Sequence, residues 1–255
     1  MNFYKLLIQY RGTSYLGFQI QTEGQKTIQG ELNRALATIT KSEDVKSVGS
    51  GRTDTGVHAL GQVVRICIPL LINGKNLVKA LNSHLPHDIR VIDAEACDEN
   101  FHPIFSAKSK EYNYVFSLET PDPFSTDLIT HYPHELDIEK MNRACKLFLG
   151  EHDFVNFQCQ GTEVATTVRR ITECEVLSFD SNGHWSNLVG KYYVIRVVGN
   201  GFLKQMVRLM VGALWNIGRG KIEESDLHRA LRAPIDGRLG ATAPPHGLYL
   251  KVVHY

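Results

Sequence analysis

The most constraining feature of this chain is the order of secondary structure that its hydrophobic pattern predicts up to residue 96. Alternating apolar residues predict strands, and apolar residues three and four positions apart predict helices. The resulting order is strand, helix, two strands, helix, strand, over 3–10, 28–39, 45–50, 62–68, 76–85 and 90–96, with Thr27 as the N-cap of the first helix. This order is typical of the split βαβ arrangement of ferredoxin-like folds.

The second half of the chain roughly repeats this order. Strands are predicted over 110–118, 168–179, 192–198 and 248–253, and helices over 137–149, 202–217 and 223–231. Gly150 is the predicted C-cap of the helix over 137–149, residues 161–167 are typical of a mobile polar loop, and Asn182-Gly183 predicts a hairpin turn. We therefore expect an α+β fold of two similar ferredoxin-like halves, 1–105 and 106–255. They would form a largely antiparallel sheet with helices on one face and a central cleft.

A glycine-rich loop lies between two of the predicted strands. The stretch Gly49–Val64, GSGRTDTGVHALGQVV, places Arg52 and Asp54 among four glycines. Glycine permits tight turns and close approach of a partner, and flanking strands hold such a loop still. A carboxylate presented in this way can act as nucleophile, general base or metal ligand, and the neighbouring arginine suits a phosphate or a second carboxylate. The structural alternative is an aspartate that only closes its own turn.

Composition and charge describe an ordinary globular protein. The 255 residues are 43% hydrophobic and 22% charged, which is enough chain for a substantial core. Because the net charge is only +1, an RNA-binding protein of this composition must gather its positive charge on one face. Three local clusters offer such charge: Arg169 with Arg170, Lys204 with Arg208, and Arg219 with Lys221. On charge alone, a solvated surface is the preferred interpretation of each cluster.

The cysteines and the N-terminus bear on the cellular compartment. The five cysteines are odd in number and include no CxxC pair, which favours reduced thiols over a disulfide framework or a structural zinc site. No apolar run approaches the ~18 residues of a membrane span, and the first residues lack the features of a signal peptide. We therefore expect a cytoplasmic protein without a membrane partner.

Several motifs, taken together and in order, resemble those of the TruA-type tRNA pseudouridine synthases. The stretches are GRTDTGVHA at 51–59 with GQVV at 61–64, YRGTSYLGFQ at 10–19, FHPIFSA at 101–107, KEYNY at 110–114, FLKQMVR at 202–208 and ATAPPHGLYL at 241–250. The resemblance extends from residue 3 to residue 253. Three positions differ from what is common in that family: Arg11 replaces an acidic residue, Phe18 replaces tryptophan, and Pro103 replaces a small residue.

The resemblance implies an enzyme that isomerises uridine to pseudouridine in the anticodon stem-loop of tRNA, at positions 38, 39 and 40. It implies a homodimer that uses neither metal nor organic cofactor. Asp54 matches the catalytic aspartate, Tyr112 the tyrosine that stacks on the target base, and Arg208 the arginine that pairs with the aspartate. Arg52 matches an arginine associated with the flipped nucleotide and its phosphates.

The chemistry leaves several roles open. Asp54 can attack ribose C1′, attack base C6, or abstract the C2′ proton, and the residues alone do not choose among these routes. Tyr112 can also assist loss of the C5 proton, whereas Tyr114 on the same strand face is predicted to be core. His58 suggests acid–base chemistry or substrate binding, but a hydrogen bond that fixes the loop is the preferred role. Phosphate contacts that position RNA are predicted for Lys204, Arg169 and Arg170.

Two rival interpretations belong to other classes of protein. A metal-dependent hydrolase could use Asp54 and His58 with others of the 11 histidines, but these histidines show no HExxH-type spacing. The second rival is an RNA-binding module that has lost catalysis. The presence of Asp54, Tyr112 and Arg208 argues against that rival.

Overall fold

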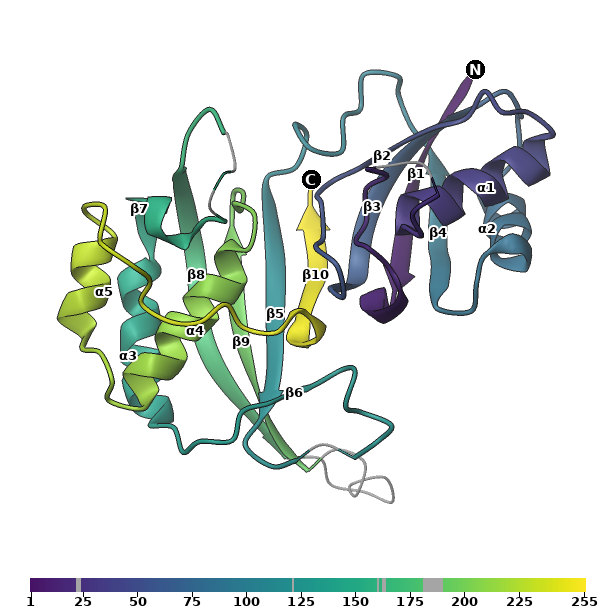
Figure 1. Ribbon diagram of the computed structural model, residues 1–255. Helices are drawn as coiled ribbons and strands as arrows, with labels where there is room; N and C mark the ends of the chain where they lie inside the picture. The colour runs from purple at the N-terminus through teal and green to yellow at the C-terminus, as the bar shows by residue number, and fades with distance from the viewer. Residues whose placement is uncertain (22–23, 121, 160, 162–163, 181–189) are drawn as a thin grey trace. The chain divides into compact units, whose positions relative to one another are not determined.

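The chain forms two compact units, which Figure 1 shows as a computed structural model. The structure describes residues 1–21, 24–120, 122–159, 161, 164–180 and 190–255. One unit is Met1–Lys108 together with Leu250–Tyr255, and the other is Ser109–Tyr249. The end of the chain thus belongs to the first unit. The predicted turn at Asn182-Gly183 and part of the predicted loop over 161–167 lie outside the described residues.

The first unit has the element order that the hydrophobic pattern predicts. Its elements are β1 (Asn2–Tyr10), α1 (Ile28–Thr40), β2 (Lys46–Gly49), β3 (His58–Ile68), α2 (Gly74–His84) and β4 (Ile89–Ala96). The strand order is β4-β1-β3-β10, where β10 (Leu248–His254) is the last strand of the chain and β2 pairs with β3. Strand β1 is antiparallel to both β3 and β4. Helices α1 and α2 contact one another beside this sheet (Figure 1).

Local chemistry explains why these elements form where they do. The Thr27 hydroxyl accepts a hydrogen bond from the Gly30 amide at 3.1 Å, which confirms the predicted N-cap of α1. Asn73 caps α2 in the same manner. Every second residue of β1 is buried, namely Tyr4, Leu6, Ile8 and Tyr10, and the buried residues of α1 include Ile28, Leu32, Ala35 and Leu36. The core of this unit lies between these two apolar faces.

The second unit is also a sheet with helices. Its elements are β5 (Ser109–Ser117), β6 (Thr130–His131), α3 (Ile138–Cys145), β7 (Gly150–Asp153), β8 (Val168–Asp180), β9 (Lys191–Gly199), α4 (Met206–Gly218) and α5 (Glu224–Ala230). The strand order is β5-β9-β8-β7, and all three of these pairs are antiparallel. The short strand β6 pairs with β5 in parallel. The predicted α+β class with a largely antiparallel sheet is confirmed.

Two predicted helix ends are wrong. Helix α4 begins at Met206 and not near residue 202, because Gln205 adopts a left-handed conformation with φ of 63° and the Lys204 carbonyl accepts from the Cys159 amide at 3.0 Å. Helix α3 ends at Cys145, and the chain continues as one 3-10 turn over Lys146–Phe148. Gly150, the predicted C-cap, is the first residue of β7.

Candidate active site

The glycine-rich loop joins β2 to β3 in the first unit, and Asp54 lies half-buried within it. The Val57 amide donates to the Asp54 carbonyl at 3.1 Å, and Gly56 has a φ of 79°. The backbone of Asp54 therefore closes this turn through its own carbonyl. Arg52, two residues before Asp54, is exposed.

Two glycines after β1 allow the backbone to lie directly against this loop. The Phe18 amide donates to the Thr53 carbonyl at 3.1 Å. A Cβ atom at Gly17 would lie 2.6 Å from that carbonyl oxygen, and Gly17 has a φ of 97°. A Cβ atom at Gly12 would lie 2.0 Å from the Val57 carbonyl oxygen. Only glycine fits at either position, which explains the spacing of the YRGTSYLG motif.

A buried polar network supports the loop from behind. The Gln62 amide nitrogen donates to the Gly51 carbonyl at 2.8 Å, and the Ser50 hydroxyl donates to the Gln62 amide oxygen at 2.6 Å. The Tyr10 and Thr53 hydroxyls are hydrogen-bonded at 2.8 Å, and Tyr10 is also hydrogen-bonded to Gln62. Burial raises the pKa of Tyr10 well above its usual value, so the hydroxyl keeps its proton.

Sequence reasoning assigned no role to Gln62. Its side chain is fully buried, at 0% exposure, in the middle of the otherwise mostly apolar strand β3. A polar residue at such a position is a signal, because a buried amide must find hydrogen-bond partners. The network binds Ser50 and Gly51, the first two residues after β2.

His58 begins β3 and is 1% exposed. Its Nδ1 atom accepts a hydrogen bond from the Gly12 amide at 3.0 Å. An accepting Nδ1 carries no proton, so the neutral ring has its hydrogen on Nε2. This geometry favours the loop-fixing role over direct contact with a substrate.

In the second unit, Tyr112 lies on β5 among buried aromatic residues. Tyr112 is 7% exposed, and its ring meets that of Phe202 edge to face at a centroid distance of 4.9 Å. Tyr114 is core, as predicted, and its hydroxyl is hydrogen-bonded to Thr130 and to the Pro244 carbonyl, each at 2.9 Å. Burial raises the pKa of Tyr114. The alternating aromatic residues of β5 therefore differ in their surroundings: Tyr114 is a core residue, and Tyr112 packs against Phe202.

Arg208 lies in the first turn of α4 and is half-buried. Its Nε donates to the Ala243 carbonyl at 2.6 Å, and its own carbonyl accepts from the Ala243 amide at 3.2 Å. These two bonds fix the direction of the guanidinium group. Burial lowers the pKa of His246, and the charge of Arg208 lowers it further. The ATAPPHGLYL motif thus supports the arginine of the FLKQMVR motif.

The predicted phosphate contacts of the second unit differ in their surroundings. Arg169 and Arg170 are neighbours on β8, so their side chains leave opposite faces of the sheet and do not form one patch. The Arg169 guanidinium donates to the carbonyls of Thr166 and Val168, at 2.9 and 2.6 Å. Arg170 and Lys204 are exposed. Of the predicted site residues, Arg52, Asp54 and His58 lie in the first unit, and Tyr112, Arg169, Arg170, Lys204 and Arg208 lie in the second.

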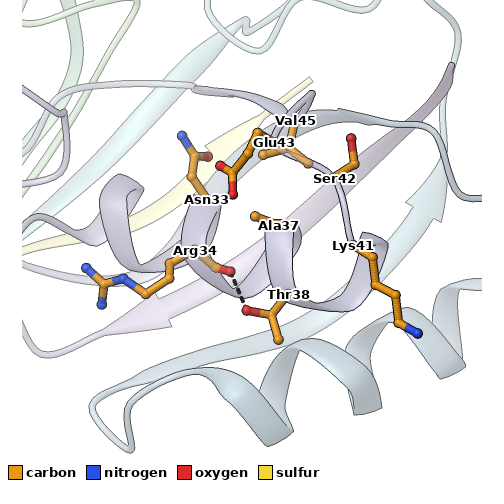
Figure 2. A pocket seen from close by; sticks show the side chains of 8 residues that line it. All are labelled: Asn33, Arg34, Ala37, Thr38, Lys41, Ser42, Glu43 and Val45. Atoms are coloured by element: carbon orange, nitrogen blue, oxygen red, sulfur yellow. Dashed lines mark hydrogen bonds between the residues drawn. The ribbon is translucent and has the colours of Figure 1, made fainter.

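A shallow hollow of about 560 Å³ lies at the end of α1, away from the predicted site residues in the sequence (Figure 2). Its lining comes from Asn33, Arg34, Ala37, Thr38, Lys41, Ser42, Glu43 and Val45. The Thr38 hydroxyl donates to the Arg34 carbonyl of the same helix at 2.9 Å. None of these residues is a predicted site residue.

Metal and membrane features complete the description of the chain. Within the described ranges, no group of three or more His, Cys, Asp or Glu side chains is arranged to hold a metal ion. Across those same residues, no helix combines the length and apolar character needed to cross a bilayer.

Comparison with known proteins identifies the family. A sequence model of the family described as tRNA pseudouridine synthase matches residues 6–106 and 144–255. A tRNA pseudouridine synthase A from Bacillus pumilus is 44% identical over 98% of this chain and 98% of its own. A protein of the same name from an Exiguobacterium species is 42% identical over 98% of this chain and 97% of its own. Another, from Limosilactobacillus fermentum, is 41% identical over 100% of this chain and 96% of its own. The chain therefore belongs to the tRNA pseudouridine synthase family of isomerases, which convert uridine to pseudouridine in tRNA.

Proposed function

We propose that this chain forms pseudouridine in the anticodon stem-loop of tRNA, at positions 38, 39 and 40, and that Asp54 acts on a flipped-out uridine. The observation that carries this proposal is the loop of Asp54. Two glycines and a buried polar network hold its backbone, and the Asp54 carbonyl accepts the hydrogen bond that closes its turn. A carboxylate on such a rigid loop is suited to catalysis, because a reacting group must stay in one orientation.

The reaction is an isomerisation that breaks one bond and forms another. The bond from ribose C1′ to base N1 breaks, the uracil turns, and a bond forms from C1′ to C5. The C5 proton leaves and N1 takes up a proton, so the step is balanced without an oxidant or a second substrate. Asp54 serves it by attack at C1′, by attack at C6, or by removal of the C2′ proton.

Arg208 and Tyr112 have complementary roles in this proposal. A guanidinium group opposite Asp54 favours the ionised carboxylate, against the desolvation that opposes it. Arginine suits this role better than lysine, which loses its charge more readily on burial. Tyr112 stacks on the extruded base, and the edge of Phe202 braces the tyrosine ring. Base flipping costs roughly a few kcal/mol of free energy, and stacking on the tyrosine ring offsets part of that cost.

Phosphate contacts are proposed for Arg52, Lys204, Arg169 and Arg170. Three of these side chains are exposed, while Arg169 already donates to backbone carbonyls and contributes mainly its charge. We assign His58 to the support of the Asp54 loop, since its Nδ1 accepts the Gly12 amide. The slope of log K against log salt is negative, and each phosphate contact that is removed should reduce its magnitude by about 0.7 to 0.9.

A homodimer in the cytoplasm is part of the same proposal. The net charge of +1 leaves one chain with little overall attraction for a polyanion. Two copies that share one tRNA would join their positive surfaces. Sedimentation that shows a fully active monomer would refute this arrangement.

The test is tritium release from tRNA labelled at uridine C5. We expect Asp54→Asn to abolish release while the Kd for tRNA changes less than about 3-fold, because the amide keeps the size of the carboxylate but not its charge. The matched control is Asp44→Asn, an exposed aspartate of the same unit, which should leave release unchanged. Retained release in Asp54→Asn would refute the role of Asp54. A wild-type protein that binds tRNA without releasing tritium would favour the RNA-binding rival.

A further inference from the structure

The loop between β4 and β5 presents an aromatic ring that the proposed chemistry does not use. Phe105 is 84% exposed, and one face of its ring stacks on His102 at a centroid distance of 4.3 Å and an interplanar angle of 30°. Exposing a phenylalanine ring to water is unfavourable. An exposed ring that is fixed against a neighbouring side chain therefore indicates a binding surface. The face of Phe105 that points away from His102 offers a stacking surface.

Hydrogen bonds within the loop hold this ring pair. The Ser106 amide donates to the His102 carbonyl at 2.8 Å, and the His102 amide donates to the Ser106 hydroxyl at 3.2 Å. The amides of Ile104 and Phe105 approach the His102 Nδ1 at 3.3 and 3.4 Å. The histidine ring is thereby oriented as a support for the phenylalanine ring. Stacking on a preformed surface requires little further ordering of the protein.

The same loop is tied to the base of the Asp54 loop. The Tyr255 hydroxyl donates to the Pro103 carbonyl at 2.9 Å, and Tyr255 directly follows β10, which neighbours β3 in the sheet. Strand β3 begins directly after the Asp54 loop and carries Gln62, which donates to the Gly51 carbonyl of that loop. The aromatic ring and the proposed catalytic carboxylate therefore belong to one hydrogen-bonded framework within the first unit.

The small extent of the exposed apolar surface favours a single flat ligand over a protein partner. The loop carries charges of both signs: Asp98 and Glu99 are exposed near its start and Lys108 at its end, and the Arg65 guanidinium donates to the Phe101 carbonyl at 2.8 Å. Arg52 is exposed in the Asp54 loop itself. The exposed apolar side chains here are Phe105 and its neighbour Ile104, at 84% and 45% exposure, and together they offer far less area than the ~800 Å² that a stable protein interface buries on each partner.

We infer that Phe105, backed by His102, is a stacking site for an unpaired nucleobase of the tRNA other than the target uridine. The inference rests on the proposed function, because it takes the RNA of that reaction as its ligand. Stacking on an aromatic face accepts any base and so positions the RNA without reading its sequence. The site would fix the stem-loop relative to Asp54.

The test measures the Kd of unmodified tRNA for Phe105 variants. Phe105→Leu keeps the apolar character but removes the ring, and it should weaken binding by about 5- to 150-fold, the equivalent of about 1 to 3 kcal/mol. Phe105→Trp should bind within about 2-fold of the wild type. The slope of log K against log salt should not change in either variant, because no ionic contact is removed. The matched control is Phe124→Leu, which alters a ring that is 80% exposed and should leave the Kd unchanged.

A direct readout uses stem-loop RNA with 2-aminopurine placed in turn at each unpaired position. Wild type and Phe105→Trp should quench the fluorescence at one position, and Phe105→Leu should not. An unchanged Kd in Phe105→Leu, an equal loss in Phe124→Leu, or a changed sedimentation coefficient would each overturn the inference, the last because it marks an interface between protein copies. These binding measurements do not depend on tritium release, so a failure of the proposed catalysis is distinguishable from a failure of the stacking site.

Discussion

Replacing Gln62 by leucine tests whether the buried network positions Asp54. The substitution keeps a side chain of similar size but removes the amide. It leaves the Gly51 carbonyl and the Ser50 hydroxyl without the bonds of 2.8 and 2.6 Å that Gln62 now makes. A buried polar group that loses its partner costs about 1 to 3 kcal/mol. For two such groups we expect a loss of roughly 2 to 6 kcal/mol in the free energy of unfolding.

Thermal unfolding and steady-state turnover measure the two consequences. Each 1 kcal/mol lowers Tm by about 2 to 4 °C in a chain of this size, so a loss of ~3 kcal/mol predicts a fall of about 6 to 12 °C. A displacement of the loop by ~1 Å lowers turnover by about 100-fold. We expect kcat to fall by roughly 10- to 100-fold, while the Kd for tRNA changes less than about 3-fold, because the Gln62 side chain is buried and removes no surface group.

The matched control is Gln9→Leu. Gln9 also donates its amide to a backbone carbonyl, that of Leu60, at 3.0 Å, but this bond is exposed to solvent. Water can replace it, so Tm and kcat should remain close to wild-type values. Wild-type kcat for Gln62→Leu, measured well below its Tm, would refute the positioning argument. Equal losses in both variants would show that any glutamine of β1 or β3 behaves in the same way.

Three further predictions test the loop contacts, the arginine and the absence of a metal step. Gly17→Ala should unfold at a lower temperature than Gly24→Ala. Both glycines have positive φ, but only at Gly17 would the added Cβ lie 2.6 Å from the Thr53 carbonyl oxygen. Equal Tm values for the two variants would contradict this. Arg208→Lys loses the Nε bond to Ala243, so kcat should fall by roughly 10-fold or more with little change in Kd. Equal losses in kcat and affinity would instead indicate a phosphate contact. Tritium release from a stem-loop RNA folded in monovalent salt should be unchanged by excess EDTA, and a loss that a divalent cation restores would support the metal-dependent rival.

Much of the fold was predictable because its signals are local. The alternation that buries Tyr112, Tyr114 and Phe116 on β5 repeats every two residues and is visible in the sequence. The N-cap at Thr27 depends on a residue three positions away. The wrong start of α4 has a non-local cause, since the Lys204 carbonyl accepts from Cys159, which is distant in the chain.

In the candidate site, too, local motifs were visible in the sequence and long-range contacts were not. The resemblance of the motifs identified Asp54, Tyr112 and Arg208 as site residues, but it did not show which contacts hold them in place. The contacts of Gly12 and Gly17 with the Asp54 loop join segments that are far apart in sequence.

The sequence by itself determined the α+β class, the family and the identity of the carboxylate on which the proposal depends. Only the tertiary structure decided what supports that carboxylate, namely the buried amide of Gln62, the neutral ring of His58 and two glycines packed on its loop. The reason is physical. Backbone periodicity and caps arise from near neighbours along the chain, whereas these buried hydrogen bonds join residues 11 to 46 positions apart on different elements, and no repeating pattern shows which of them will meet.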